Sequence, residues 1–289
     1  MRRTRAVTIA VALAATVAMA ASACSSSKAA APTRTTGAST TTSTTTPVPA
    51  VKVEKLTGGT TSPYTYDYTV EYPQLTGLPD DGMQRSINAE LMKAASEMVG
   101  DFVAVVTEEP PSTSTTAPPT ASTTPSSSTA ATAPTTTQPG GPTTHLEGKS
   151  ATLLLDPRLA SFRLEGDGFV SPAAHGFTRF RTLSYDLTTG RRLGLADLFR
   201  NGVDYLGWLS HESVAQLQAR PEIYNAQQTP AGLTPTEEHF AHFGLTPTGL
   251  EIVFDEYQVG PYAVGTPHVT FPYAQLRPLL ASPGPLDGR

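Results

Sequence analysis

The sequence predicts an α+β fold in which a mainly antiparallel sheet packs with two or three helices. Three observations lead to this prediction. Stretches of alternating apolar residues recur along the chain, hairpin-type turns separate them, and helical periodicity appears in only a few places. Two Ser/Thr/Pro-rich tracts interrupt the pattern. We therefore expect one folded domain on a tether, plus a long insertion.

The first predicted elements are a strand and a helix. Apolar or aromatic residues occupy every second position at Tyr64, Tyr66, Tyr68, Val70 and Tyr72. Such residues share one face of a strand. Pro73 and Pro79 are expected to bracket the turn that follows. A helix starting at Asp80 and Asp81 is then predicted by apolar residues at a spacing of three or four: Met83, Ile87, Leu91, Ala94, Met98, Phe102 and Val105.

The second half of the chain is predicted to be mostly strands. The expected strands span 151–155, 159–164, 177–187, 240–245, 250–254 and 268–271. Turn chemistry at 186–190 and 246–249 indicates hairpins. A helical turn at 195–199, a helix at 205–219 and a short terminal helix at 273–280 complete the prediction. The inward face of the 205–219 helix is Leu206, Leu209, Val214 and Leu217.

The N-terminus is typical of a bacterial lipoprotein signal. Three arginines precede the apolar, small-residue stretch 6–23, which ends directly before Cys24, the only cysteine. Residues 1–23 are therefore predicted to be a signal peptide. Cys24 would be acylated, for example with palmitate, and would hold the protein at the extracytoplasmic face of the cell membrane. An ordinary cleaved signal and an uncleaved anchor remain as alternatives.

Removal of the signal makes the chain more acidic. Without its three arginines the protein keeps 17 Lys and Arg against 25 Asp and Glu, a net charge of −8. Nucleic acid is a poor partner for such a surface, because phosphates require clustered basic residues. With Cys24 lipidated, no thiol remains for a disulfide.

The two low-complexity tracts set the domain boundaries. Residues 24–50 are almost entirely Ser, Thr, Ala and Pro, which predicts a disordered tether. Residues 107–145 have the same bias but are flanked by ordered sequence on both sides. The preceding flank is too small to bury its own core. We therefore predict one domain over 51–289 with a disordered insertion at 107–145.

No catalytic or metal-binding constellation is recognisable. His239 and His242 lack the His-Glu-x-x-His order of zinc proteases and are expected on a polar strand edge. Asp255 and Glu256 are adjacent, so in a strand they would point to opposite faces and could not act as a glycosidase pair. No Gly-x-Ser-x-Gly motif occurs. We expect a protein that is not an enzyme and uses no cofactor or metal.

The segment 254–265 is the strongest candidate for a binding surface. Gly260-Pro261 interrupts a strand and Gly265 permits a second reversal, which would present Tyr257 and Tyr262 around a rigid loop. Tyrosines near an acid such as Glu256 are effective recognition groups. His175, in a predicted turn, is the fourth candidate. The alternative is that both tyrosines are structural and cover the end of the sheet.

The chain resembles the RsiV-like extracellular domain family. The same module occurs in the accessory region of the peptidoglycan deacetylase PdaC and in a family of secreted mycobacterial immunogenic proteins. The resemblance rests on Tyr257-x-x-Gly260-Pro261-Tyr262-x-x-Gly265, Phe271-Pro272-Tyr273 with Leu276, Glu71-Tyr72-Pro73 with Ile87-Asn88, Ala174-His175-Gly176, Asp186-Leu187-x-x-Gly190 and Leu195-x-Asp197-Leu198-Phe199. These motifs follow one another in the family order over most of 60–106 and 150–280.

The resemblance implies a binding module. Proteins of this kind sense lysozyme outside the cell and hold a sigma factor inside it. Only four residues precede Arg5, so we expect no inward sigma-binding segment, and no deacetylase domain is recognisable. The sequence therefore predicts a membrane-anchored lipoprotein that binds an envelope protein, such as lysozyme, or a peptidoglycan-type glycan. A cell-wall hydrolase or esterase with an unrecognised site, and a structural envelope scaffold, are the alternatives.

Overall fold

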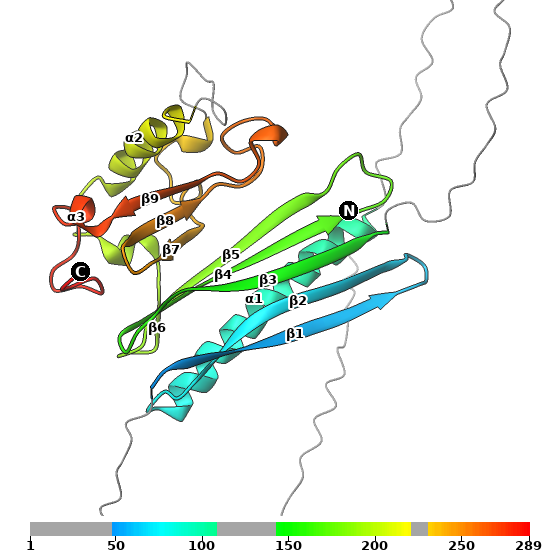
Figure 1. Ribbon diagram of the computed structural model, residues 1–289, viewed down its shortest axis with the longest axis horizontal. Helices are drawn as coiled ribbons and strands as arrows, with labels where there is room; N and C mark the ends of the chain where they lie inside the picture. Colours follow the sequence, from blue (N-terminus) through cyan, green and yellow to red (C-terminus); the bar gives the residue numbers. More distant parts are fainter. Residues whose placement is uncertain (1–47, 109–142, 221–230) are drawn as a thin grey trace, which may run out of the picture. The chain divides into compact units, whose positions relative to one another are not determined.

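The computed structural model describes residues 48–108, 143–220 and 231–289 (Figure 1). It confirms the α+β class, with mostly antiparallel sheets and three α-helices in the described residues. The described residues all belong to one compact unit. The predicted signal peptide, Cys24 and nearly all of the predicted tether and insertion lie outside the described residues.

The larger sheet has six strands in sequential order. They are β1 (Ala50–Thr60), β2 (Tyr66–Thr76), β3 (His145–Leu155), β4 (Leu159–Phe169), β5 (Phe177–Asp186) and β6 (Arg191–Leu193). Every neighbouring pair is antiparallel except β2 and β3, which run parallel. A parallel pair requires a long crossover, and the chain that leaves β2 and includes α1 supplies it.

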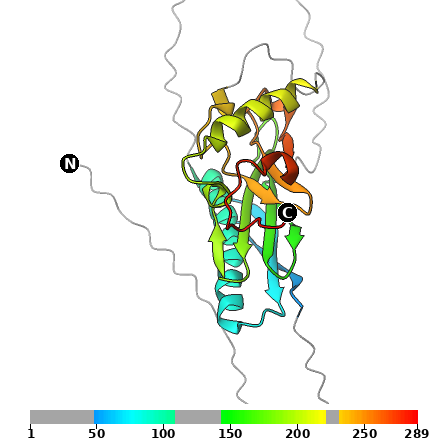
Figure 2. The same cartoon turned by 90° about the vertical axis from the view of Figure 1, so that its left-hand side faces the viewer.

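Helix α1 (Asp81–Thr107) lies along one face of this sheet (Figures 1 and 2). Asp80 caps its N-terminus, accepting hydrogen bonds from the backbone N–H groups of Gly82 and Met83 at 2.7 and 2.9 Å. Its buried residues are Ile87, Leu91, Ala94, Ala95, Met98, Phe102 and Val106. The predicted stripe is therefore correct except at its end. Val106, four residues after Phe102, faces the core, whereas Val105 is 46% exposed.

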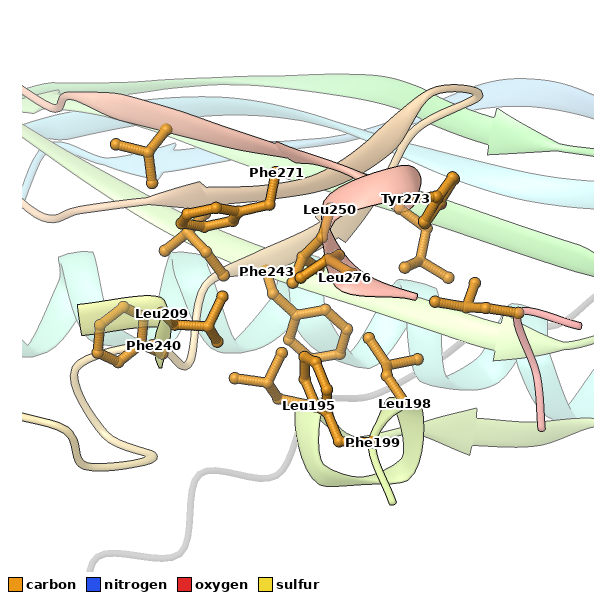
Figure 3. Packing of buried hydrophobic residues seen from close by; sticks show 14 of the residues in the cluster. Leu195, Leu198, Phe199, Leu209, Phe240, Phe243, Leu250, Phe271, Tyr273 and Leu276 are labelled. Atoms are coloured by element: carbon orange, nitrogen blue, oxygen red, sulfur yellow. The ribbon is translucent and has the colours of Figure 1, made fainter. Parts of the chain in front are cut away.

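A second, three-stranded sheet contains β7 (Phe243–Leu245), β8 (Gly249–Val253) and β9 (His268–Pro272). Helices α2 (Tyr205–Gln218) and α3 (Tyr273–Leu276) and the 3-10 turn Leu195–Leu198 enclose a hydrophobic cluster with it (Figure 3). Leu209 and Leu217 of α2 are fully buried, and Leu206 and Val214 are partly buried beside them. The inward face predicted for this helix is thus confirmed.

The two sheets meet through β4 and β5. Alternate residues of a strand point to opposite faces. On β4, Ala160 and Phe162 belong to the core under α1, while the hydroxyl of Ser161 accepts a hydrogen bond from the Leu245 backbone N–H of β7 at 2.9 Å. The larger sheet is therefore covered by α1 on one face and by β7 on the other.

Several predicted elements differ from the structure. Strand β1 was not predicted, because its sequence is charged and contains two glycines. Pro73 lies within β2 and not in a turn. It is tolerated there because β3 pairs only with residues 67–70 of β2, so Pro73 lies beyond that ladder. Tyr64 lies before β2. Phe240 is in a turn outside β7, where it is buried by its edge-on contact with Phe254.

Within the described ranges, no helix is both long enough and apolar enough to span a bilayer.

Candidate functional site

The predicted recognition loop connects β8 to β9. Tyr257 adopts a left-handed backbone conformation, with φ of 65°, and Tyr262 opens a 3-10 turn that ends at Gly265, where φ is 68°. Both tyrosines reach solvent, with 58% of Tyr257 and 38% of Tyr262 exposed. A positive φ is rare for a residue as bulky as tyrosine. The fold therefore holds Tyr257 outward against its local preference.

His175, from the β4–β5 connection, joins the two tyrosines. Its ring stacks on Tyr262, with centroids 4.0 Å apart and planes inclined by 28°, and lies 6.3 Å from the Tyr257 ring. The two tyrosine rings are 5.8 Å apart. Three of the four candidate binding residues thus form one aromatic cluster. We refer to His175, Tyr257 and Tyr262 as the aromatic cluster.

Hydrogen bonds orient the histidine ring of this cluster. Nδ1 of His175 is 2.7 Å from the Gly176 carbonyl oxygen, which can only accept, so Nδ1 carries a proton. In the neutral ring Nε2 is then an acceptor, and the Tyr257 hydroxyl donates to it at 3.2 Å. The hydroxyl of Tyr257 and the ring of His175 therefore hold each other in place.

Glu256, the fourth candidate, has a different position. Its Oε1 accepts a hydrogen bond from the Thr178 backbone N–H of β5 at 3.1 Å. This bond ties the loop to the larger sheet next to the aromatic cluster. Asp255 and Glu256 were expected on a strand, but both follow the end of β8, and Glu256 belongs to a turn.

Gln258, which the sequence did not single out, fixes the loop from the other side. Its side-chain amide donates to the carbonyl oxygens of Gly232 and His239, both at 2.9 Å, and accepts from the Asp255 N–H at 3.0 Å. A glutamine inside a turn carries no sequence signal for such a role, since its partners lie in a distant segment.

His239 and His242 do not form a joint site. His239 is in a turn, not on the expected strand edge, and its Nδ1 is 2.8 Å from the Thr234 hydroxyl. His242 instead faces Asp255, with Nε2 and Oδ2 3.4 Å apart. Burial alone would raise the pKa of Asp255, but its hydrogen bond to His242, with the charges of His242, Arg179 and Arg181, lowers it. No cluster of three or more metal-ligating His, Cys, Asp or Glu residues occurs in the described part of the chain.

A second charged group lies between the two sheets. Glu251 of β8 is hydrogen-bonded to Arg163 of β4, and its Oε1 is 2.9 Å from Nδ1 of His268 on β9. The hydrogen bond with His268 lowers the pKa of Glu251; burial opposes this change and Arg163 reinforces it. The residues come from three separate strands, so no sequence motif could have revealed them.

Comparison with known proteins supports the resemblance seen in the sequence. Residues 196–274 match the family model described as "Protein of unknown function (DUF3298)". The chain is also 29% identical, over 108 residues, to the peptidoglycan-N-acetylmuramic acid deacetylase PdaC of Bacillus subtilis. That match covers 37% of this chain and 23% of PdaC. The predicted resemblance to the module present in PdaC is confirmed.

Two solved structures are also similar. A member of the DUF3298 family from Bacteroides fragilis has a TM-score of 0.50 at 17% identity, covering 82% of this chain and 95% of its own. A DUF3298 family protein from Pseudomonas aeruginosa PAO1 has a TM-score of 0.49 at 17% identity, covering 83% and 98%. At this identity the Bacteroides structure indicates a shared fold alone.

Proposed function

We propose that this protein is a lipoprotein, anchored through Cys24 at the extracytoplasmic face of the membrane, that binds a peptidoglycan-type glycan without catalysis. The observation that carries the proposal is the aromatic cluster. His175 and Tyr257 are 82 residues apart, yet with Tyr262 they form one exposed surface, held by the hydrogen bond between His175 and Tyr257 and by the stacking of His175 on Tyr262.

The chemistry of the cluster suits a sugar ring. A pyranose has an apolar face of C–H groups and a rim of hydroxyls. Tyrosine offers a rigid apolar face and a polar tip, at a low cost in side-chain entropy. Glu256 holds the loop to the larger sheet and Gln258 holds it to the segment before β7, so the tyrosines need little reorganisation on binding.

The predicted extracytoplasmic location and the similarity to PdaC both support peptidoglycan as the class of ligand. The predicted lipoprotein signal would deliver the domain to the side of the membrane where peptidoglycan lies. PdaC is named for its action on peptidoglycan. Because the match covers 23% of PdaC, we propose a shared ligand class and not a shared reaction.

Co-sedimentation with purified peptidoglycan sacculi tests this proposal. We expect the detergent-solubilised full-length protein to sediment with the sacculi, and Tyr257→Ala or Tyr262→Ala to weaken binding about tenfold or more, as at an interface hot spot. Tyr64→Ala is the matched control, because Tyr64 is exposed at 37%, close to the 38% of Tyr262, but lies outside the cluster. Equal sedimentation of all three variants with the unmodified protein would refute the proposal.

A protein ligand is the main alternative outcome. If hen egg-white lysozyme is retained by the immobilised full-length protein, and sacculi are not, the cluster is a protein-recognition surface. If envelope proteins co-purify with the Tyr257→Ala variant as well as with the unmodified protein, a scaffold role that does not use the cluster is favoured.

One observation favours a second function, a cell-wall hydrolase. His242 and Asp255 form a partly buried pair of the type that can act as a general base. This function predicts release of soluble fragments from sacculi that disappears in Asp255→Asn. If the protein releases no fragments under conditions in which it binds sacculi, this second function is wrong.

A further inference from the structure

A pocket that shares no lining residue with the aromatic cluster is lined by β6, the 3-10 turn that follows it, and the turn before β7. Its volume is about 590 Å³, within the usual range for small-molecule sites. Leu193, Leu195 and Phe243 are its buried apolar lining residues. Leu195 and Phe243 are labelled in Figure 3. The pocket can therefore take up an aliphatic group.

Charges of both signs line the same pocket. Arg192 lies on β6, and Glu237 and Glu238 lie on the turn before β7. Within the described residues, none of the three takes part in a salt bridge. Opposite charges that share an apolar pocket without pairing to each other leave complementary positions for a ligand that carries both signs.

Two further contacts define the polar side of the pocket. Glu237 is held in place by the Tyr205 hydroxyl, which donates to its Oε1 at 3.1 Å. Glu238 has no such bond to any described residue. Thr182 of β5 also lines the pocket and is 9% exposed, and its hydroxyl makes no hydrogen bond to any of the described residues. This hydroxyl retains contact with solvent, so it can offer a hydrogen bond to a ligand in the pocket.

The guanidinium of Arg192 is pre-positioned. It donates to the Thr182 carbonyl oxygen at 3.4 Å, which holds it over the same part of β5. A guanidinium has five N–H donors, so this bond leaves several free to bind a carboxylate. Arg192 is therefore suited to the acidic group of a ligand, and Glu238 to its ammonium group.

We propose that this pocket binds a small zwitterion with an aliphatic side chain, that is, a free amino acid or a short peptide. The ligand carboxylate binds Arg192 and its ammonium binds Glu238 and Glu237. Its side chain packs on Leu193, Leu195 and Phe243. This site is independent of the aromatic cluster and does not rest on the proposed glycan binding.

NMR titration tests the proposal. The full-length protein is labelled at its leucine methyl groups, and a matched series of small ligands is added to it. L-leucine carries both charges, isoamylamine lacks the carboxylate, and 4-methylpentanoate lacks the ammonium. We expect L-leucine or L-leucyl-L-leucine to shift the Leu193 and Leu195 methyl signals, with affinity about tenfold or more above that of either single-charge analogue. Tighter binding of the dipeptide than of leucine would identify a peptide as the ligand, and the reverse an amino acid.

Two variants then test which residue binds each charged group of the ligand. Glu238→Gln should lower the affinity for the leucine ligand to that for 4-methylpentanoate, and Arg192→Gln should lower it to that for isoamylamine. Glu212→Gln, on α2 outside the pocket, is the control and should change nothing. Tyr257→Ala should also bind leucine normally, which separates this proposal from the glycan proposal.

Two results would overturn the inference. One is the absence of any shift in these methyl signals at about 20 mM leucine or dileucine, a concentration that would detect even millimolar affinity. The other is equal affinity for leucine and its single-charge analogues. Thermal unfolding of each variant establishes that a lost signal reflects binding and not loss of the fold.

Discussion

The two faces of the six-stranded sheet are held by different kinds of interaction. Under α1 the buried contacts are mainly apolar, with Phe162 and Leu164 of β4 fully buried, although Glu90 and Asp101 of the helix also bond to Tyr185 and Arg181 of β5. Toward the three-stranded sheet, the same strand presents Ser161 and Arg163, which bond to Leu245 and Glu251. One strand therefore contributes to a hydrophobic core on one side. On the other side it contributes these polar contacts and one apolar residue, Leu159, which belongs to the second hydrophobic cluster.

This difference has consequences for stability and for specificity. Apolar burial is non-directional and does not depend on pH. The polar interface requires each donor to meet its acceptor. Its side-chain atoms Nε of Arg163 and Oδ1 of Asp255 are buried without a hydrogen-bond partner within the described residues. We infer that the apolar core under α1 holds the helix to the sheet, while the polar interface fixes the position of the second sheet and of the loop that starts at Asp255.

The largest expected effect is on the apolar face. Phe162→Ala should lower the free energy of unfolding by about 4 kcal/mol, because a fully buried phenylalanine leaves a cavity beneath α1. Chemical denaturation of the full-length protein measures the change. Met92→Ala, on the exposed side of α1, is the control and should stay within about 0.5 kcal/mol. A loss below about 1 kcal/mol for Phe162→Ala would mean that the core under α1 contributes little to the stability of the fold.

Removing one partner of the polar interface should cost less. Glu251→Gln is expected to destabilise the protein by about 2 kcal/mol, because Arg163 keeps a charge with little exposure and loses its carboxylate. Combining it with Arg163→Met should recover part of the loss, since no unpaired charge then remains. Denaturant unfolding of both single variants and the double variant measures this coupling. Strict additivity would show that the two side chains do not interact.

The two faces should also differ in their response to acid. The pKa values of Glu251 and Asp255 are lowered in the folded protein. Such groups stabilise the fold above their unfolded pKa of about 4, and this contribution is lost as pH falls through the folded value. Stability should therefore decrease below about pH 4, and the decrease should be smaller in Glu251→Gln/Asp255→Asn. Urea unfolding between about pH 7 and pH 3 measures both curves. Parallel curves would assign the acid sensitivity to other carboxylates.

The contrast between apolar burial and specific polar contacts also explains which parts of the fold can be predicted from the sequence. Helix α1 and the hairpin of β4 and β5 follow from local periodicity, which burial on one face imposes. Strand β1 has no such signal, because it is an edge strand whose residues are mostly exposed. The division into two sheets was not predictable either. It depends on contacts such as Ser161 with Leu245, which are 84 residues apart.

The candidate site was predicted in part. Tyr257, Tyr262 and His175 were identified from turn chemistry and residue type, but their mutual contact was not, because periodicity contains no information about distant turns. Arg163 and Gln258 were missed for the same reason. Their roles are defined only by partners that the fold brings to them.

A smaller effect should follow from the neutral part of the polar interface. Ser161→Ala is expected to cost about 1–2 kcal/mol, because the buried Leu245 N–H loses its acceptor and Ser184 loses its partner at 2.9 Å. The loss should not vary with pH, in contrast to that of Glu251→Gln. Measuring unfolding at two pH values tests this, and a pH-dependent loss would show that the serine pair is coupled to the ionic group.

The smallest effect concerns the loop that starts from the polar interface. With φ of 65°, Tyr257 lies in the left-handed region, which glycine adopts without steric cost and other residues adopt at a cost of about 1 kcal/mol. Tyr257→Gly should therefore be more stable than Tyr257→Ala by about 1 kcal/mol, although both remove the contact with His175. At Met92, inside α1, the order should reverse, since glycine is about 1 kcal/mol worse than alanine in a helix. Thermal unfolding of the four variants makes the comparison. If alanine is the better residue at both positions, the loop does not hold a strained tyrosine. If Tyr257→Gly is more stable than Tyr257→Ala and both variants lose binding to sacculi, the strained backbone at residue 257 serves to present the tyrosine ring to the ligand.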